Sequence, residues 1–297
     1  MTDFERTPVT VPKLAEMKGA GEPIVMVTAY DYPSAQVVER AGVDVVLVGD
    51  TAAMVVLGYD ATTPVGMDEM LIMAAAVGRG LKTPLLIGDM PFGSYERSNE
   101  HAIDNAQRYV REAGCKAVKL ERGGASVERA RAIVRSGIPV MGHVGLTPQT
   151  VNALGGFKTQ GKTAESAAKV AEEALALQAA GCFAIVFEAV PAAITEALMP
   201  KIDIPVIGIG AGAATDGQVL VFHDLLGIYA GHTPKFVKRY AEIGADMADA
   251  VGRYAAEVRA RSFPAREHTY SVEADELEEF KQYLDQESLA AESRWDW

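Results

Sequence analysis

The chain has 297 residues, of which 49% are hydrophobic, so it is long enough for one large α/β barrel or for two ordinary domains. Its formal net charge of −12 argues against nucleic acid as a partner, because nucleic-acid binding depends on neutralising phosphates. The N-terminus lacks the apolar core of a signal peptide, and no apolar run reaches the roughly 18 residues of a membrane span. We therefore expect a cytoplasmic protein that binds no membrane.

The first residues, 1–10, have the composition of a loose arm. A short helix is predicted from Val11 to Lys18, with Pro12 near the first helical position. From there on, a helical pattern repeatedly ends in glycine and a strand-like run follows at once, at Gly42, Gly114, Gly137 and Gly181. Glycine after the last helical residue is the usual left-handed cap. Four copies of one helix–strand junction imply repeated βα units and a parallel sheet.

Eight short apolar runs are typical of buried parallel strands, and they lie at 24–28, 43–49, 84–88, 117–121, 138–143, 182–188, 204–209 and 219–223. Helical patterns separate most of them, including Met67–Val77 and two helices that end at Ala113 and Ala179 with Ser98 and Thr163 as caps. Eight such units predict a (β/α)8 TIM barrel of the α/β class. A doubly wound open sheet is the alternative, but it would want a glycine-rich turn after the first strand, and none follows residue 28.

Two regions break this rhythm. Residues 145–162 contain Gly155, Gly156 and Gly161 and form either a mobile lid or a plain surface loop. A long helix is predicted from just after Pro234 to about Arg261, and the tail 271–297 is acidic, with a helical pattern of apolar residues. We expect a barrel domain over residues 1–270 with a C-terminal helical extension, and a partly ordered acidic tail over 271–297.

Carboxylates follow three of the predicted strands, as Asp50, Asp89 and Glu121. A buried charge is costly unless it has a partner, and oxygen ligands held on separate rigid strands suit Mg²⁺. Each acid taken alone could merely cap the next helix. The three together favour a metal site at the carboxyl ends of the strands, where barrel enzymes build their active sites.

Other polar residues occupy the same end of the predicted barrel. Lys119 and Glu121 are two apart on one strand and therefore face the same side, as a structural ion pair or as part of a site for an anionic substrate. Glu188 ends an apolar run whose surroundings raise a carboxylate pKa toward that of a general base, although it could also cap the helix that Pro191 opens. His143 is either a substrate ligand or a structural histidine.

The sequence has no apparent Ser–His–Asp or Cys–His set. Both cysteines, Cys115 and Cys182, stand in apolar contexts typical of small buried hydrophobes in a reducing compartment, and no zinc-ligand spacing is present. Metal-assisted chemistry remains: a cation that chelates an α-keto acid would acidify its neighbouring C–H group. Glu188 could then take the proton to give an enolate, with Lys119 on the substrate carboxylate.

Seven motifs in order along the chain resemble the ketopantoate hydroxymethyltransferase family: MVTAYD at 26–31, VGDT at 48–51, IGDMPF at 87–92, VKLE at 118–121, GHVGLTPQ at 142–149, GGFK at 155–158 and IGIGAG at 207–212. The resemblance covers about residues 8 to 270 and implies a barrel similar to the phosphoenolpyruvate/pyruvate enzymes. It implies transfer of a hydroxymethyl group from 5,10-methylenetetrahydrofolate to 3-methyl-2-oxobutanoate. The product would be 2-dehydropantoate, in the first committed step of pantothenate biosynthesis.

The resemblance also implies roles for the strand-end residues. It places Asp50, Asp89 and Glu121 around Mg²⁺, makes Glu188 the proton acceptor, and gives substrate contacts to Asp50, Thr51, Asp89, Lys119 and His143. Thr51 stands where the family usually has serine, and the hydroxyl is retained. Homo-oligomers, commonly decamers, are implied as well. No residues for the folate cosubstrate are indicated, and the acidic tail lies beyond the family's usual end.

Two other functions use the same barrel. A carbon–carbon lyase or phosphonate mutase would share the metal–enolate core, but such enzymes usually need a reactive cysteine or a phosphate clamp, and neither cysteine follows a predicted strand. A non-catalytic barrel that binds metabolites would leave metal affinity and activity unchanged in an Asp89→Asn variant.

Overall fold

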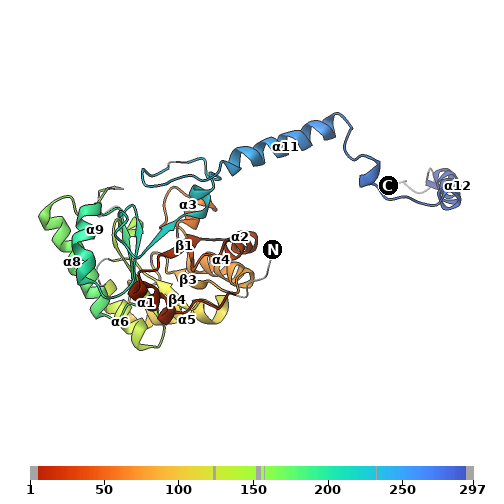
Figure 1. Ribbon diagram of the computed structural model, residues 1–297. Helices are drawn as coiled ribbons and strands as arrows, with labels where there is room; N and C mark the ends of the chain where they lie inside the picture. The colour runs from red at the N-terminus through yellow and green to blue at the C-terminus, as the bar shows by residue number, and fades with distance from the viewer. Residues whose placement is uncertain (1–5, 123–124, 152–154, 157, 232, 292–297) are drawn as a thin grey trace. The chain divides into compact units, whose positions relative to one another are not determined.

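The structure, a computed structural model, describes residues 6–122, 125–151, 155–156, 158–231 and 233–291, with side chains up to residue 285 (Figure 1). The chain divides into two compact units, Met1–Gly244 and Ala245–Trp297. The glycine-rich part of the expected lid falls partly outside the described residues. The domain boundary expected at residue 270 stays a prediction.

Eight parallel strands of the first unit close into a barrel in chain order, so the predicted (β/α)8 fold is confirmed. The strands are β1 (Ile24–Thr28), β2 (Val45–Val48), β3 (Leu85–Asp89), β4 (Ala117–Lys119), β5 (Val140–Gly145), β6 (Ala184–Glu188), β7 (Val206–Ile209) and β8 (Gly217–Leu220). Closure is made by β8 on β1, where Val219 pairs with Met26.

The helices of this unit surround the strands (Figure 1). They are α1 (Val11–Ala20), α2 (Tyr32–Ala41), α3 (Ala52–Val55), α4 (Met67–Gly80), α5 (Asn99–Ala113), α6 (Ser126–Arg135), α8 (Ala164–Ala179), α9 (Ala192–Leu198) and α10 (Phe222–Leu225), with 3₁₀ turns η1 (Pro148–Thr150) and η2 (Met199–Lys201). The predicted caps are confirmed: Ser98 accepts a hydrogen bond from the backbone N–H of His101, and Thr163 accepts one from Ser166.

Two predicted boundaries are wrong. The last strand is β8 at Gly217–Leu220 rather than 219–223, and residues 222–225 are helical. The start of this strand is not apparent from the sequence, because Gly217 lacks the apolar side chain expected of a buried strand. A Cβ there would lie 2.4 Å from the carbonyl oxygen of Ile24, so β1 can approach β8 only at a glycine.

The second wrong boundary is the start of the long helix, α11 (Ile243–Arg259), which was expected just after Pro234. The backbone between Pro234 and Ile243 instead forms hydrogen bonds with the C-terminal end of α10 and the residue that follows it. Tyr240 donates its N–H to the carbonyl of Leu225, and Ile243 donates to Leu226. These hydrogen bonds hold the chain in an irregular course until residue 243.

Alternate residues of the strands point into the barrel. An apolar layer of inward-facing side chains fills its middle, including Met26, Ile87, Met141, Val186 and Ile207. Leu14 and Met17 of α1 are buried in the same cluster. Because α1 precedes β1 and packs at the amino ends of the strands, this end of the barrel is closed. The polar site can lie only at the other end.

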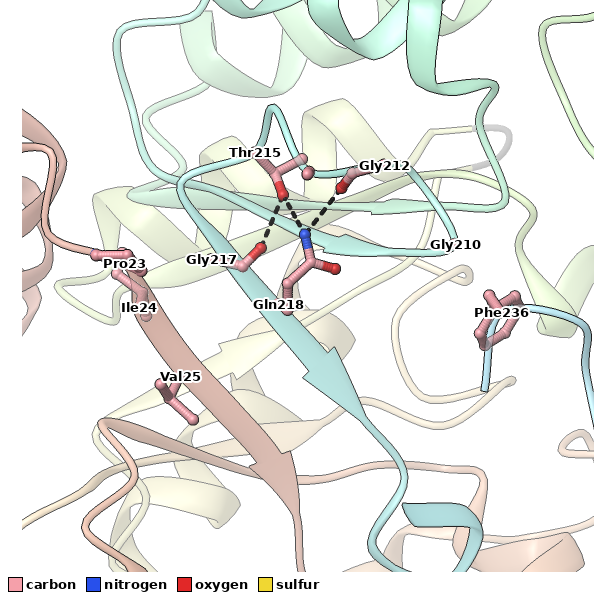
Figure 2. A pocket seen from close by; sticks show the side chains of 10 residues that line it. Pro23, Ile24, Val25, Gly210, Gly212, Thr215, Gly217, Gln218 and Phe236 are labelled. Carbon is pink, nitrogen blue, oxygen red and sulfur yellow. Dashed lines mark hydrogen bonds between the residues drawn. The ribbon is translucent and has the colours of Figure 1, made fainter. Parts of the chain in front are cut away.

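The outer face of β1 and β8 carries a cavity of about 530 Å³ (Figure 2). In Figure 2 the side chain of Gln218 donates to the carbonyl of Gly212 and to Thr215, which tethers the turn before β8. Val25 of β1 is 48% exposed on this face. The helix that follows β8, α10, has four residues and leaves this part of the barrel wall open.

The second unit contains most of α11, the 3₁₀ turn η3 (Arg266–His268) and α12 (Ala274–Ala291). Much of the acidic tail is therefore helical. Four apolar side chains of α11, those of Met247, Val251, Tyr254 and Val258, are between 43% and 66% exposed. Among the described helices of both units, none is long and apolar enough to cross a membrane.

Candidate functional site

The alternation that fills the barrel with apolar residues also brings the predicted site residues together. The next inward-facing residues on β3, β5 and β6 are polar. Asp89, His143 and Glu188 lie two positions after Ile87, Met141 and Val186, respectively. Lys119 and Glu121 extend the row of Ala117 on β4. A polar layer therefore lies directly above the apolar layer, at the carboxyl ends of the strands.

Lys119 and Asp89 form a buried ion pair across neighbouring strands. The Nζ atom of Lys119 lies 2.6 Å from Oδ1 of Asp89, and their side chains are 5% and 2% exposed. Burial disfavours the ammonium, but Asp89, Glu121 and Asp50 together raise the pKa of Lys119. These charges favour the ammonium form of Lys119, and the ion-pair partner that the structure gives it is Asp89 rather than the Glu121 of a simple Lys–Glu pair.

Asp50 follows β2 and contacts the same group of charges. Its backbone N–H donates to Oδ2 of Asp89 at 3.2 Å. Burial, followed by the nearby charges of Asp89 and Glu121, raises the pKa of Asp50 well above its ordinary value. Burial likewise raises the pKa of Asp89. A further cation beside these carboxylates would favour their ionised forms.

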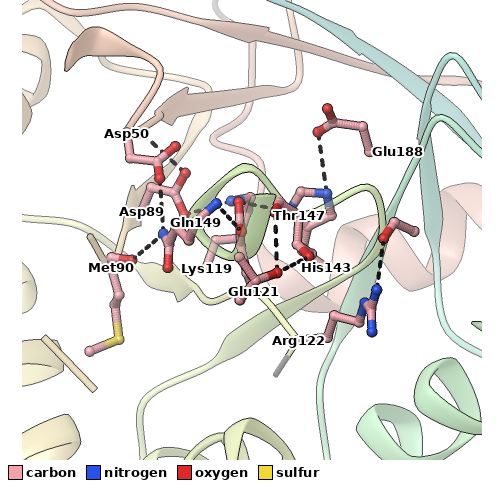
Figure 3. A network of polar contacts seen from close by, with 12 residues as sticks. Asp50, Asp89, Met90, Lys119, Glu121, Arg122, His143, Thr147, Gln149 and Glu188 are labelled. Atoms are coloured by element: carbon pink, nitrogen blue, oxygen red, sulfur yellow. Dashed lines mark hydrogen bonds and ion pairs between the residues drawn. The ribbon is translucent and has the colours of Figure 1, made fainter. Parts of the chain in front are cut away.

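His143 lies between two carboxylates from neighbouring strands (Figure 3). Its Nδ1 atom is 3.4 Å from Oε1 of Glu121, and its Nε2 atom is 3.3 Å from Oε2 of Glu188. Burial opposes the charged ring, but the two carboxylates raise the pKa of His143 to about 9. Although burial pushes in the other direction, His143 also holds the pKa of Glu121 below its ordinary value. The two acids therefore favour the charged form of the His143 ring.

Gln149 contacts two of the predicted site residues, although no pattern in the sequence assigns it a role. It is buried in η1, just after β5, and its side-chain amide contacts Asp50 and the backbone of Met90 (Figure 3). Its backbone N–H donates to Oε2 of Glu121 at 3.0 Å. The only sequence signal was its membership of the GHVGLTPQ motif, because glutamine is common on surfaces and no spacing rule marks it.

A cavity of about 550 Å³ opens above the polar layer. All seven predicted site residues line it: Asp50, Thr51, Asp89, Lys119, Glu121, His143 and Glu188. Its outer part is lined by apolar and aromatic side chains, including Met54, Leu146 and Phe236, and by the basic residues Lys158 and Lys235. Cavities of about 300–1,000 Å³ are the usual size for small-molecule sites. This one has an acidic floor and a basic rim.

The backbone leaves the site sharply after Glu188. Ala189 has a φ of 49°, in the left-handed region that residues with a Cβ rarely adopt. Its N–H donates to the carbonyl of Ile209, and its carbonyl accepts from the N–H of Gln160. These hydrogen bonds hold the strained turn, and Glu188 remains directed toward His143.

The residues that could hold a metal have suitable ligand atoms, but their side chains are not arranged around one position. In the described part of the chain, no three histidine, cysteine or carboxylate side chains are already close enough together to hold a metal ion. Lys119 occupies one oxygen of Asp89, and Gln149 occupies one of Asp50. The donors nevertheless fit a hard divalent cation, because all are carboxylate oxygens and two of the acids have pKa values raised by burial and mutual repulsion.

Comparison with known proteins decides the family. The model of the family described as "Ketopantoate hydroxymethyltransferase" matches residues 8–266. The chain belongs to the ketopantoate hydroxymethyltransferase family. The resemblance found in the seven motifs is thereby confirmed. The matched region includes the whole barrel and all residues that line the cavity.

Similar proteins of known name agree. The 3-methyl-2-oxobutanoate hydroxymethyltransferase of Carboxydothermus hydrogenoformans is 53% identical over 270 residues, which cover 91% of this chain and 98% of that protein. The protein of Arabidopsis thaliana named 3-methyl-2-oxobutanoate hydroxymethyltransferase 1, mitochondrial, is 51% identical and covers 92% of this chain and 80% of its own length.

Solved structures share the fold at much lower identity. Phosphonopyruvate hydrolase matches with a TM-score of 0.58 at 14% identity, over 97% of this chain and 99% of that one. 2,3-Dimethylmalate lyase, described as a member of the PEP mutase/isocitrate lyase superfamily, matches with a TM-score of 0.54 at 15% identity, over 97% and 100%. At this level of identity the likenesses show a shared fold and nothing of the reaction. Cys115 and Cys182 precede β4 and β6, at the end of the barrel opposite the site, so neither supplies the reactive thiol of a lyase.

Proposed function

We propose that this chain is a 3-methyl-2-oxobutanoate hydroxymethyltransferase of pantothenate biosynthesis. The observation that carries the proposal is the match of the family model over residues 8–266, together with the polar layer that the matched strands place in one cavity. In the proposed reaction, 5,10-methylenetetrahydrofolate supplies the one-carbon unit, and the product is 2-dehydropantoate.

Glu188 is the proposed general base. Its carboxylate would take the proton from C3 of the keto acid, and the electron pair of that C–H bond would move into a C2–C3 double bond as the ketone oxygen becomes an enolate. His143, whose Nε2 atom is 3.3 Å from Oε2 of Glu188, orients that carboxylate. Water breaks the two carbon–nitrogen bonds that join the one-carbon unit to folate, which gives formaldehyde and leaves one hydrogen on each nitrogen. C3 then bonds to the formaldehyde carbon, and the resulting alkoxide takes the proton held by Glu188 to become the hydroxyl group.

Lys119 is the proposed ligand of the keto-acid carboxylate, and Thr51 supplies a hydroxyl at the same wall of the cavity. Lys119 is charged and fully buried, and its pairing with Asp89 leaves it facing the cavity floor. An anionic substrate beside it would gain a charge-assisted contact in a low-dielectric environment. The same carboxylate would be repelled by Asp50, Asp89 and Glu121 unless those charges were also compensated.

Mg²⁺ is the proposed compensating cation, with Asp50, Asp89 and Glu121 as the residues that would hold it. When bound, it would polarise the ketone and make the C3 proton more acidic. Asp50 and Asp89 are adjacent through the 3.2 Å contact between them, so both can turn toward a shared position. Asp89 would then give up part of its contact with Lys119, which frees the ammonium for the substrate carboxylate.

The outer part of the cavity is the proposed place for the folate cosubstrate. A five-carbon keto acid fills only the polar floor of a 550 Å³ cavity. Phe236 forms part of the wall above, where its ring lies against Gly210; a Cβ at that glycine would come within 2.6 Å of the ring. Lys158 and Lys235 at the rim suit the glutamate carboxylates of a folate, and the apolar walls suit its flat ring system.

A homo-oligomer in the cytoplasm is also proposed. The exposed apolar side chains of α11 supply surface that a second copy could cover, which supports self-association. The decamer remains an implication of the resemblance. The name of the Arabidopsis protein includes mitochondrial, whereas that of the bacterial relative does not. Light scattering after gel filtration measures the mass of the assembly, and a monomer would contradict the proposal.

Deuterium exchange at C3 of 3-methyl-2-oxobutanoate, followed by NMR, tests the proposed chemistry. In deuterated water with Mg²⁺ and no folate, the purified protein should exchange the C3 proton for deuterium, and EDTA should stop the exchange. Adding 5,10-methylenetetrahydrofolate should then give 2-dehydropantoate. If the complete mixture yields no product, the chain is not this transferase. If product forms without any metal, the role given to the three carboxylates is wrong.

A further inference from the structure

Gln149 connects two strand-end carboxylates, Asp50 after β2 and Glu121 after β4, which are the strands on either side of β3. Its Nε2 atom is 2.9 Å from Oδ2 of Asp50 and 3.0 Å from the carbonyl oxygen of Met90. Its Oε1 atom is 2.6 Å from the hydroxyl of Tyr95. Its backbone N–H donates to Glu121 at 3.0 Å. Both polar atoms of the Gln149 amide therefore have hydrogen-bond partners, and the residue is almost fully buried.

The orientation of this amide follows from its partners. The backbone carbonyl of Met90 can only accept a hydrogen bond, so the group that faces it must be the NH₂ of Gln149 rather than its oxygen. The second hydrogen of that NH₂ then points at Asp50, and the remaining amide oxygen accepts from Tyr95. Asp50 consequently receives a donor on one fixed oxygen, which leaves its other oxygen directed elsewhere in the cavity.

We propose that Gln149 is a positioning residue that sets Asp50 and Glu121 for cation binding, and that Tyr95 acts through Gln149. The argument rests on the proposed function, because it takes these two carboxylates as cation ligands. One short segment, η1, reaches both of them by different atoms: the side-chain amide holds Asp50, and the backbone N–H holds Glu121. Partners of this kind keep a ligand oriented although they never touch the ion.

A purely structural role would predict something else. If Gln149 only tied η1 to Met90, its removal would lower stability and leave the affinity for a cation unchanged. If it positions the carboxylates, its removal lets Asp50 rotate and weakens cation binding in protein that is still folded. Tyr95 offers a milder test, because its hydroxyl lies 2.6 Å from the amide oxygen of Gln149 and 3.5 Å from the backbone carbonyl oxygen of Glu121, so it contacts neither carboxylate group directly.

Titration with Mn²⁺, followed by electron paramagnetic resonance, compares the wild type with Gln149→Leu, Tyr95→Phe and the double variant. Losing an outer partner of a metal ligand typically costs about 10- to 100-fold in affinity, and we expect this loss for Gln149→Leu. Tyr95→Phe should lose less, and the double variant should match Gln149→Leu, because the two residues act in series. Gln36→Leu, on the exposed face of α2, is the matched control.

Melting curves in EDTA verify that each variant is folded, and Tyr95→Phe keeps the test decisive should Gln149→Leu not fold. Mn²⁺ affinities of both variants within twofold of the wild type would overturn the inference while leaving the proposed function intact. Additive losses in the double variant would overturn the coupling between Tyr95 and Gln149. A wild type that binds no Mn²⁺ would overturn both the inference and the metal assignment in the proposed function.

Discussion

The Nζ atom of Lys119 lies 2.6 Å from Oδ1 of Asp89, and this pair is enclosed at the carboxyl ends of β3 and β4. The ammonium is surrounded by three acids, because Glu121 and Asp50 also raise its pKa. The pair is therefore less a closed structural bridge than one cation shared among several anions. In the proposed function, the ammonium of Lys119 can bind an anionic substrate once a metal ion compensates the carboxylates around it.

Replacing Lys119 by alanine should weaken both stability and substrate binding. Removing one partner of a buried ion pair typically costs about 3–5 kcal/mol, because the remaining charge is left without compensation. We expect a loss of this size in urea unfolding and a rise in KM for the keto acid. Lys201→Ala, at the opposite end of the barrel, is the control. An unchanged KM would return Lys119 to a structural role.

Glu188→Gln should retain binding of the keto acid and lose proton exchange at its C3. General bases typically contribute about 10²- to 10⁴-fold to a rate, and the amide cannot accept the proton. The exchange rate by NMR and the keto-acid dissociation constant by calorimetry measure the two properties separately. Glu165→Gln, on an exposed turn of α8, is the matched control. Equal exchange by Glu188→Gln and wild type would remove Glu188 as the base.

Stability of the metal-free protein should fall as pH rises above neutrality, because of His143. Glu121 and Glu188 raise its pKa to about 9 against the opposing effects of burial and of Lys119. The folded protein therefore holds a proton that the unfolded chain releases near pH 6.5. The stabilisation is complete below about pH 6.5 and is lost as pH rises through about 9.

Urea unfolding in EDTA between pH 6 and 10 measures this dependence. His143→Gln supplies the background titration of the rest of the chain, and subtracting it should isolate the histidine. A difference between the two proteins that stays constant over this range would show that the ring is not held as an imidazolium.

Gly88 should not tolerate a side chain. A Cβ on this residue of β3 would lie 2.3 Å from Cδ1 of Tyr109, whose hydroxyl donates to the carbonyl of Asp89. Overpacking of this kind typically costs about 1–3 kcal/mol, so Gly88→Ala should lower the melting temperature and disturb Asp89. Gly19→Ala in α1 meets nothing within 4 Å and should instead stabilise by roughly 0.5–1 kcal/mol. Equal melting temperatures for the two variants would contradict this packing.

Both thiols should be unreactive in the folded protein. Burial raises the pKa values of Cys115 and Cys182 to about 12, so almost no thiolate forms at pH 8. Ellman's reagent should label neither in native protein and both in denaturant. Rapid native labelling would reopen the possibility of a reactive cysteine.

The barrel could be predicted from sequence because its signals are local. Glycine caps, strand-length apolar runs and serine or threonine N-caps each depend on a few neighbouring residues, and they placed seven strands closely. The eighth strand was misplaced because Gly217 is required by a distant contact with Ile24, which no local pattern reveals. The start of α11 was misplaced for a similar reason, because hydrogen bonds to Leu225 and Leu226 hold the segment before it.

The site was predictable to the same extent. Because burying a charge is costly, an acid at the end of an apolar strand is conspicuous, and the sequence alone predicts Asp50, Asp89 and Glu121. The sequence assigns no role to Gln149, because an amide carries no charge. Its contribution to the site depends on three hydrogen-bond partners that lie far from it along the chain. The contact of His143 with Glu121 depends on the register of β5 against β4, and its contact with Glu188 depends on the register of β5 against β6, which the sequence does not specify.

The closed amino end of the barrel makes the cavity a well with one entrance. In the described part of the chain, Leu14 and Met17 below and the apolar layer above them fill the middle of the barrel with buried side chains. In the proposed arrangement, with the keto acid on the floor and the larger folate at the mouth, the keto acid must enter before folate covers the mouth. The products must leave in the reverse order, tetrahydrofolate first and 2-dehydropantoate second. Excess tetrahydrofolate would then block the mouth of the cavity and slow turnover even when the keto acid is abundant.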